Sequence, residues 1–301
     1  AYVHTSYDYS PLNRVLKKLG PGADWHLNDQ AQCFGYFTNT AIGELSVPYI
    51  TIEGDKLRMN GTYPAGSFTV RSVEEEGGVT YYEFTDMEGK LIKYKNVQYI
   101  YDDLGRLRYV LPKQVFNYST DTNIQEGLNE TTSKTGIYKF GYAYTYDSRG
   151  NCIAKRLPGI APIYYVYDSG SRLILSQTPN QRVREEWSFN KYDAMSRIIL
   201  SGTTLIRNQS HQALLNGYSK TLSREELNAS SGVNYGYTNL TLPKENLTIL
   251  KTNYYDNYDF APLVYFRFPI GFVSRSSYPS SYHTSPKGQL TCSISRTLSN
   301  P

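Results

Sequence analysis

Tyr101-Asp102-Asp103-Leu104-Gly105-Arg106-Leu107 is the stretch of sequence that decides the fold, because its pattern recurs along the chain. The clearest further copies are Tyr167-Asp168-Ser169-Gly170-Ser171-Arg172-Leu173 and Tyr192-Asp193-Ala194-Met195-Ser196-Arg197-Ile198, and weaker copies begin at Thr85, Tyr146 and Tyr9. The shared frame is an aromatic residue, Asp, two variable residues, a small or turn-tolerant residue, a basic residue and an apolar residue. A frame that recurs in this way predicts a repeat architecture.

Each copy of the frame predicts a β-hairpin turn. An Asp carboxylate at the start of a type I turn accepts hydrogen bonds from backbone N–H groups a few residues on, and glycine three residues later permits the positive φ that closes the turn. The predicted turn positions are Asp86 with Gly89, Asp102 with Gly105, Asp147 with Gly150, Asp168 with Ser171, and Asp193 with Ser196. Serine tolerates a positive φ poorly, so a different turn is an open alternative in the last two copies.

Residues 137–146 predict a strand with one aromatic face. Every even position carries a ring, and the odd positions are mostly small or polar, which is the period of two of a β-strand. The rings are Tyr138, Phe140, Tyr142, Tyr144 and Tyr146. Packing between repeats is the favoured interpretation of this face, and a ligand platform for sugars is the alternative. Residues 90–101 show rings and lysines on both faces, which is typical of a sheet that is partly covered on each side.

The composition makes tyrosine a main packing residue. The 301 residues include 30 tyrosines, and the hydrophobic share of 40% counts them, so the aliphatic supply is thin. The net charge of +4 comes from 31 basic and 27 acidic residues scattered along the chain. No basic block is long enough to follow a phosphate backbone, and no apolar run approaches the roughly 18 residues of a spanning helix. We therefore expect neither nucleic-acid binding nor membrane insertion.

The sequence lacks the patterns of catalytic and metal sites. Its four histidines are dispersed, and its three cysteines are too far apart for a zinc site or a disulfide framework. It contains neither a Gly-x-Ser-x-Gly elbow nor a glycine-rich nucleotide loop. Asp256, Asn257 and Asp259 permit calcium ligation, but a turn is favoured because the glycine and glutamate of a calcium loop are missing. We predict no catalytic residue, no cofactor and no metal.

The chain divides into three parts by pattern. Residues 1–80 predict an irregular antiparallel β segment, residues 81–202 the hairpin repeats, and residues 203–301 a helix-containing insertion followed by returning strands. Over 208–228 the pattern permits one or two short helices, with Asn208 or Ser210 and Ser223 as candidate N-caps. Residues 254–260 predict a strand with Tyr-Asp pairs, which is not counted as a repeat because it lacks the glycine and arginine.

The repeated Tyr-Asp turns resemble the YD repeats of the RHS family, which includes bacterial RHS proteins, the C component of insecticidal toxin complexes and the teneurins. The resemblance spans most of the chain, is strongest over residues 85–202, and fits the N-terminal part of a bacterial repeat region. It implies an all-β chain of antiparallel hairpins in a curved or spiralling sheet, part of the wall of a hollow shell. The family's aspartyl autoproteolytic site is built around Asp-Pro motifs, and this sequence has no Asp-Pro dipeptide.

The function that the resemblance implies is a non-enzymatic structural scaffold. Its partner is a downstream, toxin-like C-terminal segment of the same polypeptide, and its place is outside the cell or on the cell surface, as for a secreted bacterial protein. The alternative is a cell-surface carbohydrate-binding or adhesion module, which uses the aromatic face of 138–146 and has a glycan as its partner.

Overall fold

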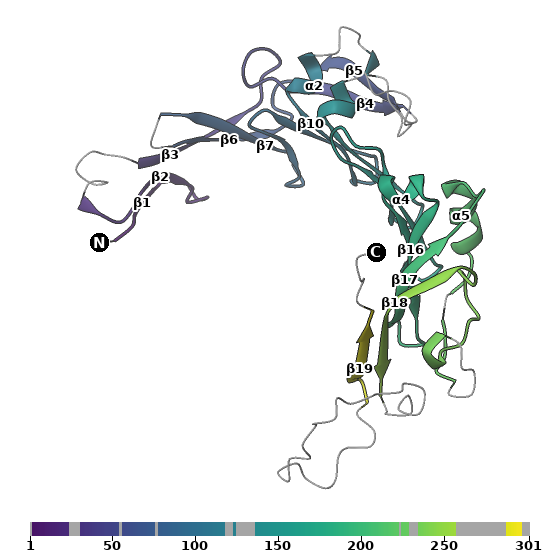
Figure 1. Cartoon of the computed structure of the whole chain (residues 1–301). Helices are drawn as coiled ribbons and strands as arrows, with labels where there is room; N and C mark the ends of the chain where they lie inside the picture. The colour runs from purple at the N-terminus through teal and green to yellow at the C-terminus, as the bar shows by residue number, and fades with distance from the viewer. Residues whose placement is uncertain are drawn as a thin grey trace, which may run out of the picture. The chain divides into compact units, whose positions relative to one another are not determined.

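The structure is a computed structural model, and it describes residues 2–23, 31–53, 56–75, 78–117, 123–124, 136–222, 224–228, 234–256 and 287–296 (Figure 1). Antiparallel strands make up most of the regular structure, and sixteen of them form one sheet whose order follows the chain apart from β4, β5 and β11. Sequential antiparallel neighbours are what hairpin repeats produce. The predicted all-β class is confirmed. The described residues form two compact units.

The first unit contains residues 1–145 and 156–161. Its part of the long sheet has the order β1 (His4–Tyr7), β2 (Val15–Leu19), β3 (Ala31–Thr38), β6 (Thr69–Glu74), β7 (Thr80–Thr85), β8 (Leu91–Tyr94), β9 (Val97–Tyr101), β10 (Leu107–Pro112) and β12 (Tyr142–Tyr146). A small second sheet has the order β11 (Asn123–Ile124), β5 (Lys56–Thr62) and β4 (Pro48–Glu53). The small sheet interrupts the strand sequence between β3 and β6.

The small sheet packs on β9 and β10 and closes the core of the first unit. Ile50 and Leu57 from the small sheet share an apolar cluster with Ile100 and Leu111, and each is at most 6% exposed. The Gln98 side chain donates a hydrogen bond to the backbone oxygen of Pro48 at 2.7 Å, so the contact also satisfies a buried amide. Two short helices, α2 (Gln114–Asn117) and α3 (Gly136–Phe140), add apolar side chains to the same cluster.

The predicted strand over 137–146 is wrong in its first half. Residues Gly136–Phe140 form α3, and only Tyr142–Tyr146 form a strand. Ile137 is fully buried in the cluster with Leu57 and Leu111, and the Gly141 N–H bonds the Ile137 carbonyl at 2.8 Å to end the turn of helix. Burial of Ile137 against residues distant in sequence outweighs the local period of two, because packing overrides strand propensity.

The mixed pattern of residues 90–101 also has a structural cause. These residues form two strands, β8 and β9, joined by a tight turn at which Lys95 adopts a φ of 51°. Lys93 pairs with Gln98, and Tyr94 with Val97, across that turn. A single-strand interpretation therefore assigns the residues after the turn to the wrong faces, since the hairpin restarts the alternation.

The second unit contains residues 146–155 and 162–301. Its strands are β13 (Cys152–Arg156), β14 (Ile163–Tyr167), β15 (Leu173–Gln177), β16 (Glu186–Tyr192), β17 (Ile198–Leu205), β18 (Leu247–Tyr255) and β19 (Leu290–Ser295). Helix α5 (His211–Tyr218) lies against one face of this sheet (Figure 1). Leu214 and Tyr218 of α5, with Tyr237 beyond it, bury the apolar side chains of Trp187 and Phe189.

The two faces of the second unit's sheet differ in chemistry. Residues that pair directly across antiparallel strands lie on the same face. The covered face carries Leu175 opposite Phe189, and Leu200 opposite Thr252. From β15 to β18 the other face carries polar pairs, namely Ser176 with Ser188, Ser188 with Thr203, Asn190 with Ser201, and Ser201 with Lys251. On β14 the same face carries Tyr165, opposite Ser176, and Ile163. From β15 to β18 each strand therefore has one apolar and one polar face, which needs few aliphatic residues.

The helices are more numerous than the sequence predicted. The described residues contain four short α-helices and one 3-10 helix (Asn234–Gly236) rather than one or two helices. Ser210 is the N-cap of α5, where its hydroxyl accepts from the Ala213 N–H at 3.2 Å, while Ser223 lies outside the described residues. Helix α4 (Pro179–Val183) begins after Thr178 with a capping box that Gln181 completes. Its Thr-Pro-x-Gln signal was present in the sequence and was missed.

The other predictions about organisation have mixed outcomes. β18 ends at Tyr255, so the last part of the predicted strand 254–260 lies outside the described residues. The predicted boundaries at residues 80 and 202 stay predictions. Within the described ranges, no helix has the length and apolar character that crossing a membrane requires.

Candidate functional site

The five predicted Asp-centred turns, four of them preceded by tyrosine and one by Thr85, share one backbone geometry. In each, the Asp N–H donates to the carbonyl oxygen of the residue four positions later. The N–H of the residue three positions after the Asp donates to the Asp carbonyl. The first of these bonds measures 3.0 Å for Asp86, 2.9 Å for Asp102, 3.0 Å for Asp147, 3.0 Å for Asp168 and 3.1 Å for Asp193. This pair of hydrogen bonds is typical of a type I turn that is closed by a residue with positive φ.

In every one of these turns the Asp carboxylate accepts hydrogen bonds from N–H groups of the turn itself. Its Oδ1 atom accepts from the backbone N–H groups two and four residues later, for example Gly170 at 2.9 Å and Arg172 at 3.0 Å around Asp168. Its Oδ2 atom accepts from the side chain of the fourth residue in four turns, those of Asp102, Asp147, Asp168 and Asp193. In Asp102, burial opposes the charged form, but the bonds from Arg106 outweigh it and lower the pKa.

The serine copies use the same turn as the glycine copies. The φ angles are 84° at Gly89, 72° at Gly105, 86° at Gly150, 59° at Ser171 and 63° at Ser196. The alternative of a different turn at the two serines therefore does not hold. The hydrogen bonds around Asp168 and Asp193 outweigh the steric cost of a left-handed serine, which is about 1–2 kcal/mol.

We expect Gly150→Ala to lower the free energy of unfolding by about 1–2 kcal/mol, because alanine has to adopt the same positive φ. A Cβ at Gly150 meets no atom within 4 Å, so the change isolates backbone strain from crowding. Gly217→Ala is the matched control, since its Cβ also meets open space but lies on helix α5, where alanine is favoured by up to about 1 kcal/mol. Urea denaturation of both variants checks the opposite signs; equal effects would contradict the turn geometry.

A sixth turn is centred on Asp8 rather than on the copy that begins at Tyr9. The Asp8 N–H bonds the Arg14 carbonyl at 2.7 Å, and its carboxylate accepts from the Arg14 N–H at 2.8 Å and from Arg14 Nε at 2.7 Å. Asn13 takes the positive φ, at 48°. The bond from the Arg14 side chain contributes most to a pKa of about 2 for Asp8. The Tyr7-Asp8 pair was the available signal, and two extra turn residues concealed it.

A seventh turn is opened by a long insertion. The Asp256 N–H bonds the Gln289 carbonyl at 3.1 Å, and the Gly288 N–H bonds the Asp256 carboxylate at 2.6 Å. Tyr255 pairs with Leu290 at a bulge, as Tyr101 does with Leu107. A glycine, Gly288 with a φ of 78°, thus follows after residues 257–286, but Gln289 stands where the frame has its basic residue, and Asp256 itself has a φ of 70°. Asn257 and Asp259 of the calcium alternative lie outside the described residues.

Arginine side chains connect consecutive turns in the second unit. We call Arg149, Arg172 and Arg197 the arginine series. Arg149 Nη1 donates to the Asp168 carbonyl at 2.8 Å, Arg172 Nη1 to Ser196 Oγ at 3.2 Å, and Arg197 Nη1 to Asp256 Oδ1 at 2.9 Å. Arg172 and Arg197 also lie over the rings of Tyr192 and Tyr255, at 4.8 and 4.3 Å. Arg172 and Arg197 therefore each pair with a turn carboxylate and stack on a tyrosine ring.

The aromatic row divides between two elements. Tyr138 and Phe140 lie on α3, while Tyr142, Tyr144 and Tyr146 lie on one face of β12, and all five are half-buried. The Tyr138 hydroxyl bonds the Gly159 carbonyl at 3.3 Å, and Arg156 lies 5.7 Å from its ring centre. The described structure thus gives Tyr138 internal contacts. A sugar platform on these rings stays a prediction.

A buried ion pair, which no sequence pattern indicated, fixes residues 224–228 to β16, and further bonds from the same lysine fix residues 239–241. Lys191 Nζ lies 2.8 Å from Glu225 Oε1, and both side chains are fully buried. Burial disfavours the charged form of Glu225, but bonds from Lys191, Thr238 and Thr241 outweigh it, so its pKa is lowered. Lys191 also donates to Asn239 Oδ1 at 2.7 Å. The two partners are 34 residues apart, and such separation leaves no local signal.

Metal ligation has no support within the described part of the chain, where no group of three or more His, Cys, Asp and Glu side chains is placed to hold an ion. His211 bonds the Tyr165 carbonyl at 3.0 Å and stacks on Tyr164 at 4.3 Å, so it has a packing role. Cys33, Cys152 and Cys292 are free thiols.

Comparisons with known proteins gave one family-model match and matches to solved structures. Residues 1–38 match a domain of unknown function, DUF6443. No protein with a curated description matches the chain. A crystal structure of TcdB2-TccC3-TEV matches at 11% identity and a TM-score of 0.30, over 83% of this chain and 13% of that one. The Photorhabdus luminescens Tc holotoxin pore with a mutation in TccC3 matches at 13% identity and a TM-score of 0.23, over 84% and 13%.

The chain spans 13% of the length of each matched structure. The Tyr-Asp turns, with their repeated Asp bonds and positive φ, are the features of this chain on which the resemblance rests.

Proposed function

We propose that this chain is a non-enzymatic scaffold, a stretch of the wall of an RHS-type shell that encloses a downstream C-terminal segment of the same polypeptide. The observation that carries the proposal is the run of antiparallel strands in chain order, joined by Asp-centred turns. Repeats that contact their neighbours in order build extended surfaces rather than one closed core. The charged groups of the turns bond one another, which is typical of structural residues.

The polar sheet face of the second unit supports an enclosing role. Serine, threonine and asparagine at Ser176, Ser188, Asn190, Ser201 and Thr203 offer hydrogen bonds but little apolar area. A face of this kind suits a water-filled space or an unfolded chain, because neither requires burial of apolar surface. We propose that this face is turned toward the enclosed segment, and that the assembled protein works outside the cell or at its surface.

The test is electron microscopy of the full parent polypeptide combined with limited proteolysis. We expect a hollow body with internal density, in which the segment after residue 301 resists protease. Asp168→Ala, which breaks a turn, should expose that segment, while Asp103→Ala should not, because the Asp103 side chain is exposed and outside the turn bonds. A solid particle, or a segment that is equally sensitive in all three proteins, would contradict an enclosing wall.

A further inference from the structure

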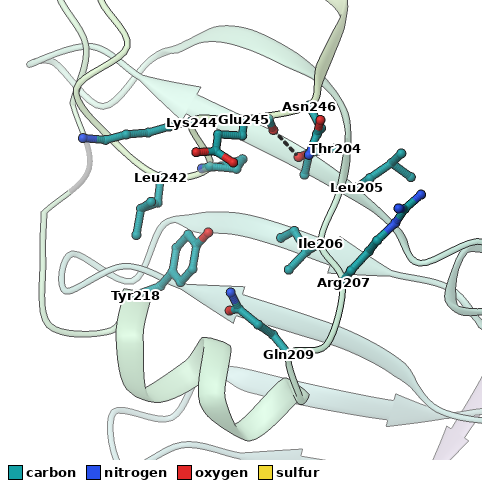
Figure 2. A pocket seen from close by; sticks show the side chains of 11 residues that line it. Thr204, Leu205, Ile206, Arg207, Gln209, Tyr218, Leu242, Lys244, Glu245 and Asn246 are labelled. Carbon is teal, nitrogen blue, oxygen red and sulfur yellow. Dashed lines mark hydrogen bonds between the residues drawn. The ribbon is translucent and has the colours of Figure 1, made fainter.

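A hollow of about 410 Å³ opens between the end of β17, the residues that follow it, the last residue of α5 and residues 242–246 (Figure 2). This volume is within the range of small-molecule sites, about 300–1,000 Å³. Its shape is set by internal bonds, since Thr204 Oγ1 donates to the Glu245 carbonyl at 2.9 Å and Asn239 Nδ2 to the Lys244 carbonyl at 2.9 Å. Lys191 of β16 holds Glu225, Asn239 and Thr241, which precede residues 242–246 in the chain.

Tyr218 gives the hollow an unused polar group. Its side chain is only 8% exposed, and its hydroxyl has no hydrogen-bond partner among the described residues. Figure 2 shows the ring of Tyr218 directed from α5 into the hollow, toward Ile206 and Leu242. The hydroxyl is not among the buried polar atoms that lack a partner, so it contacts solvent, and a ligand in the hollow can take the place of that water. Burial raises the pKa of Tyr218 to about 12, so the hydroxyl stays protonated near neutral pH.

The remaining lining combines an apolar base with a polar rim. Ile206, Leu242 and Pro243 supply the apolar surface, and Gln209, Lys244 and Glu245 supply an amide and opposite charges. Arg207 is already paired with Glu185, at 3.3 Å. Because the charges offset one another, the lining favours neither a strong anion nor a cation. Donors and acceptors around an apolar base match a neutral sugar ring, which has hydroxyls at its edge and an apolar face.

We propose that this hollow binds a neutral pyranose unit of a glycan. Tyr218 Oη and the Gln209 amide bond sugar hydroxyls, and Ile206 and Leu242 contact the apolar face of the ring. The site is separate from the aromatic row of residues 138–146 and does not depend on the shell function. A scaffold with this hollow has a means of attachment to a glycan surface.

The experiment is a saturation-transfer NMR titration of this chain with methyl glucoside, methyl galactoside, N-acetylglucosamine and glucuronate at millimolar concentrations. We expect binding of at least one neutral sugar, weakened about tenfold by Tyr218→Phe, which corresponds to about 1.4 kcal/mol. Gln209→Ala should weaken it as well. Tyr165→Phe, which removes a hydroxyl outside the hollow, is the matched control and should have no effect.

Several outcomes would overturn the proposal. These are binding of no neutral sugar, binding of glucuronate alone, or unchanged affinity in Tyr218→Phe. Loss of binding in Tyr142→Ala with full binding in Tyr218→Phe would assign sugars to the aromatic row instead. Circular dichroism of each variant establishes that it is folded, and since Gln209 is exposed, its variant keeps the test informative if Tyr218→Phe is unstable.

Discussion

Lys191→Met is expected to lower the free energy of unfolding by about 3–5 kcal/mol, because it leaves the Glu225 carboxylate buried without its counter-charge. Both side chains are fully buried, and Lys191 Nζ is 2.8 Å from Glu225 Oε1. Guanidinium denaturation followed by tryptophan fluorescence measures the change, and Trp187 lies in the apolar cluster of the same unit.

The control is the double variant Lys191→Met with Glu225→Gln. Replacing both charges removes the unpaired carboxylate, so the double variant should lose less stability than Lys191→Met alone. Full recovery is not expected, because Glu225 also accepts from the Leu240 N–H at 2.8 Å and the Thr241 N–H at 2.9 Å. A single variant within about 1 kcal/mol of the parent would contradict a buried charged pair.

Asp168→Ala is expected to have the largest effect of any turn substitution, about 3–5 kcal/mol. The Asp168 side chain is fully buried, and Arg172, which bonds its Oδ2 through Nη2 at 2.6 Å, is 11% exposed. Alanine removes the acceptor of two backbone N–H groups and leaves the Arg172 guanidinium without its carboxylate. Equilibrium denaturation again gives the value.

Asp102→Ala provides the comparison within the same chain. Its turn has the same bonds, but the side chains of Asp102 and Arg106 are 13% and 25% exposed. In Asp102→Ala, water can replace part of the hydrogen bonding that the carboxylate supplied. We therefore expect a smaller loss in the free energy of unfolding, about 1–2 kcal/mol. A larger loss for Asp102→Ala than for Asp168→Ala would show that burial does not control the contribution of these turns.

The turns could be predicted because their chemistry is local. Asp168 and its partners lie within four residues, so the spacing of the sequence contains the whole hydrogen-bond set. Helix α3 could not be predicted in the same way, because Ile137 is buried against Leu57 and Leu111, which are far away in sequence. Its alternating rings therefore indicated a strand that packing does not allow.

Separation along the chain also explains what was missed in the candidate sites. From the sequence, Lys191 and Glu225 are two charged residues 34 positions apart, with nothing to distinguish them from surface residues. Only the fold places them in contact. The free hydroxyl of Tyr218 depends on three separate segments, namely β17, α5 and residues 242–246. The capping box of α4 is different, since Thr178 and Gln181 formed a recognisable local signal.

The turn at Asp256 and Gly288 shows that the hydrogen bonds across a hairpin end do not depend on a short loop between the two strands. The bonds that join the two strands need an Asp on one side and a Gly on the other, whatever lies between them. Loop entropy rises slowly, by about 0.6 kcal/mol for each doubling of length. A turn of this kind can therefore accept an inserted segment while the pairing of the two flanking strands stays the same.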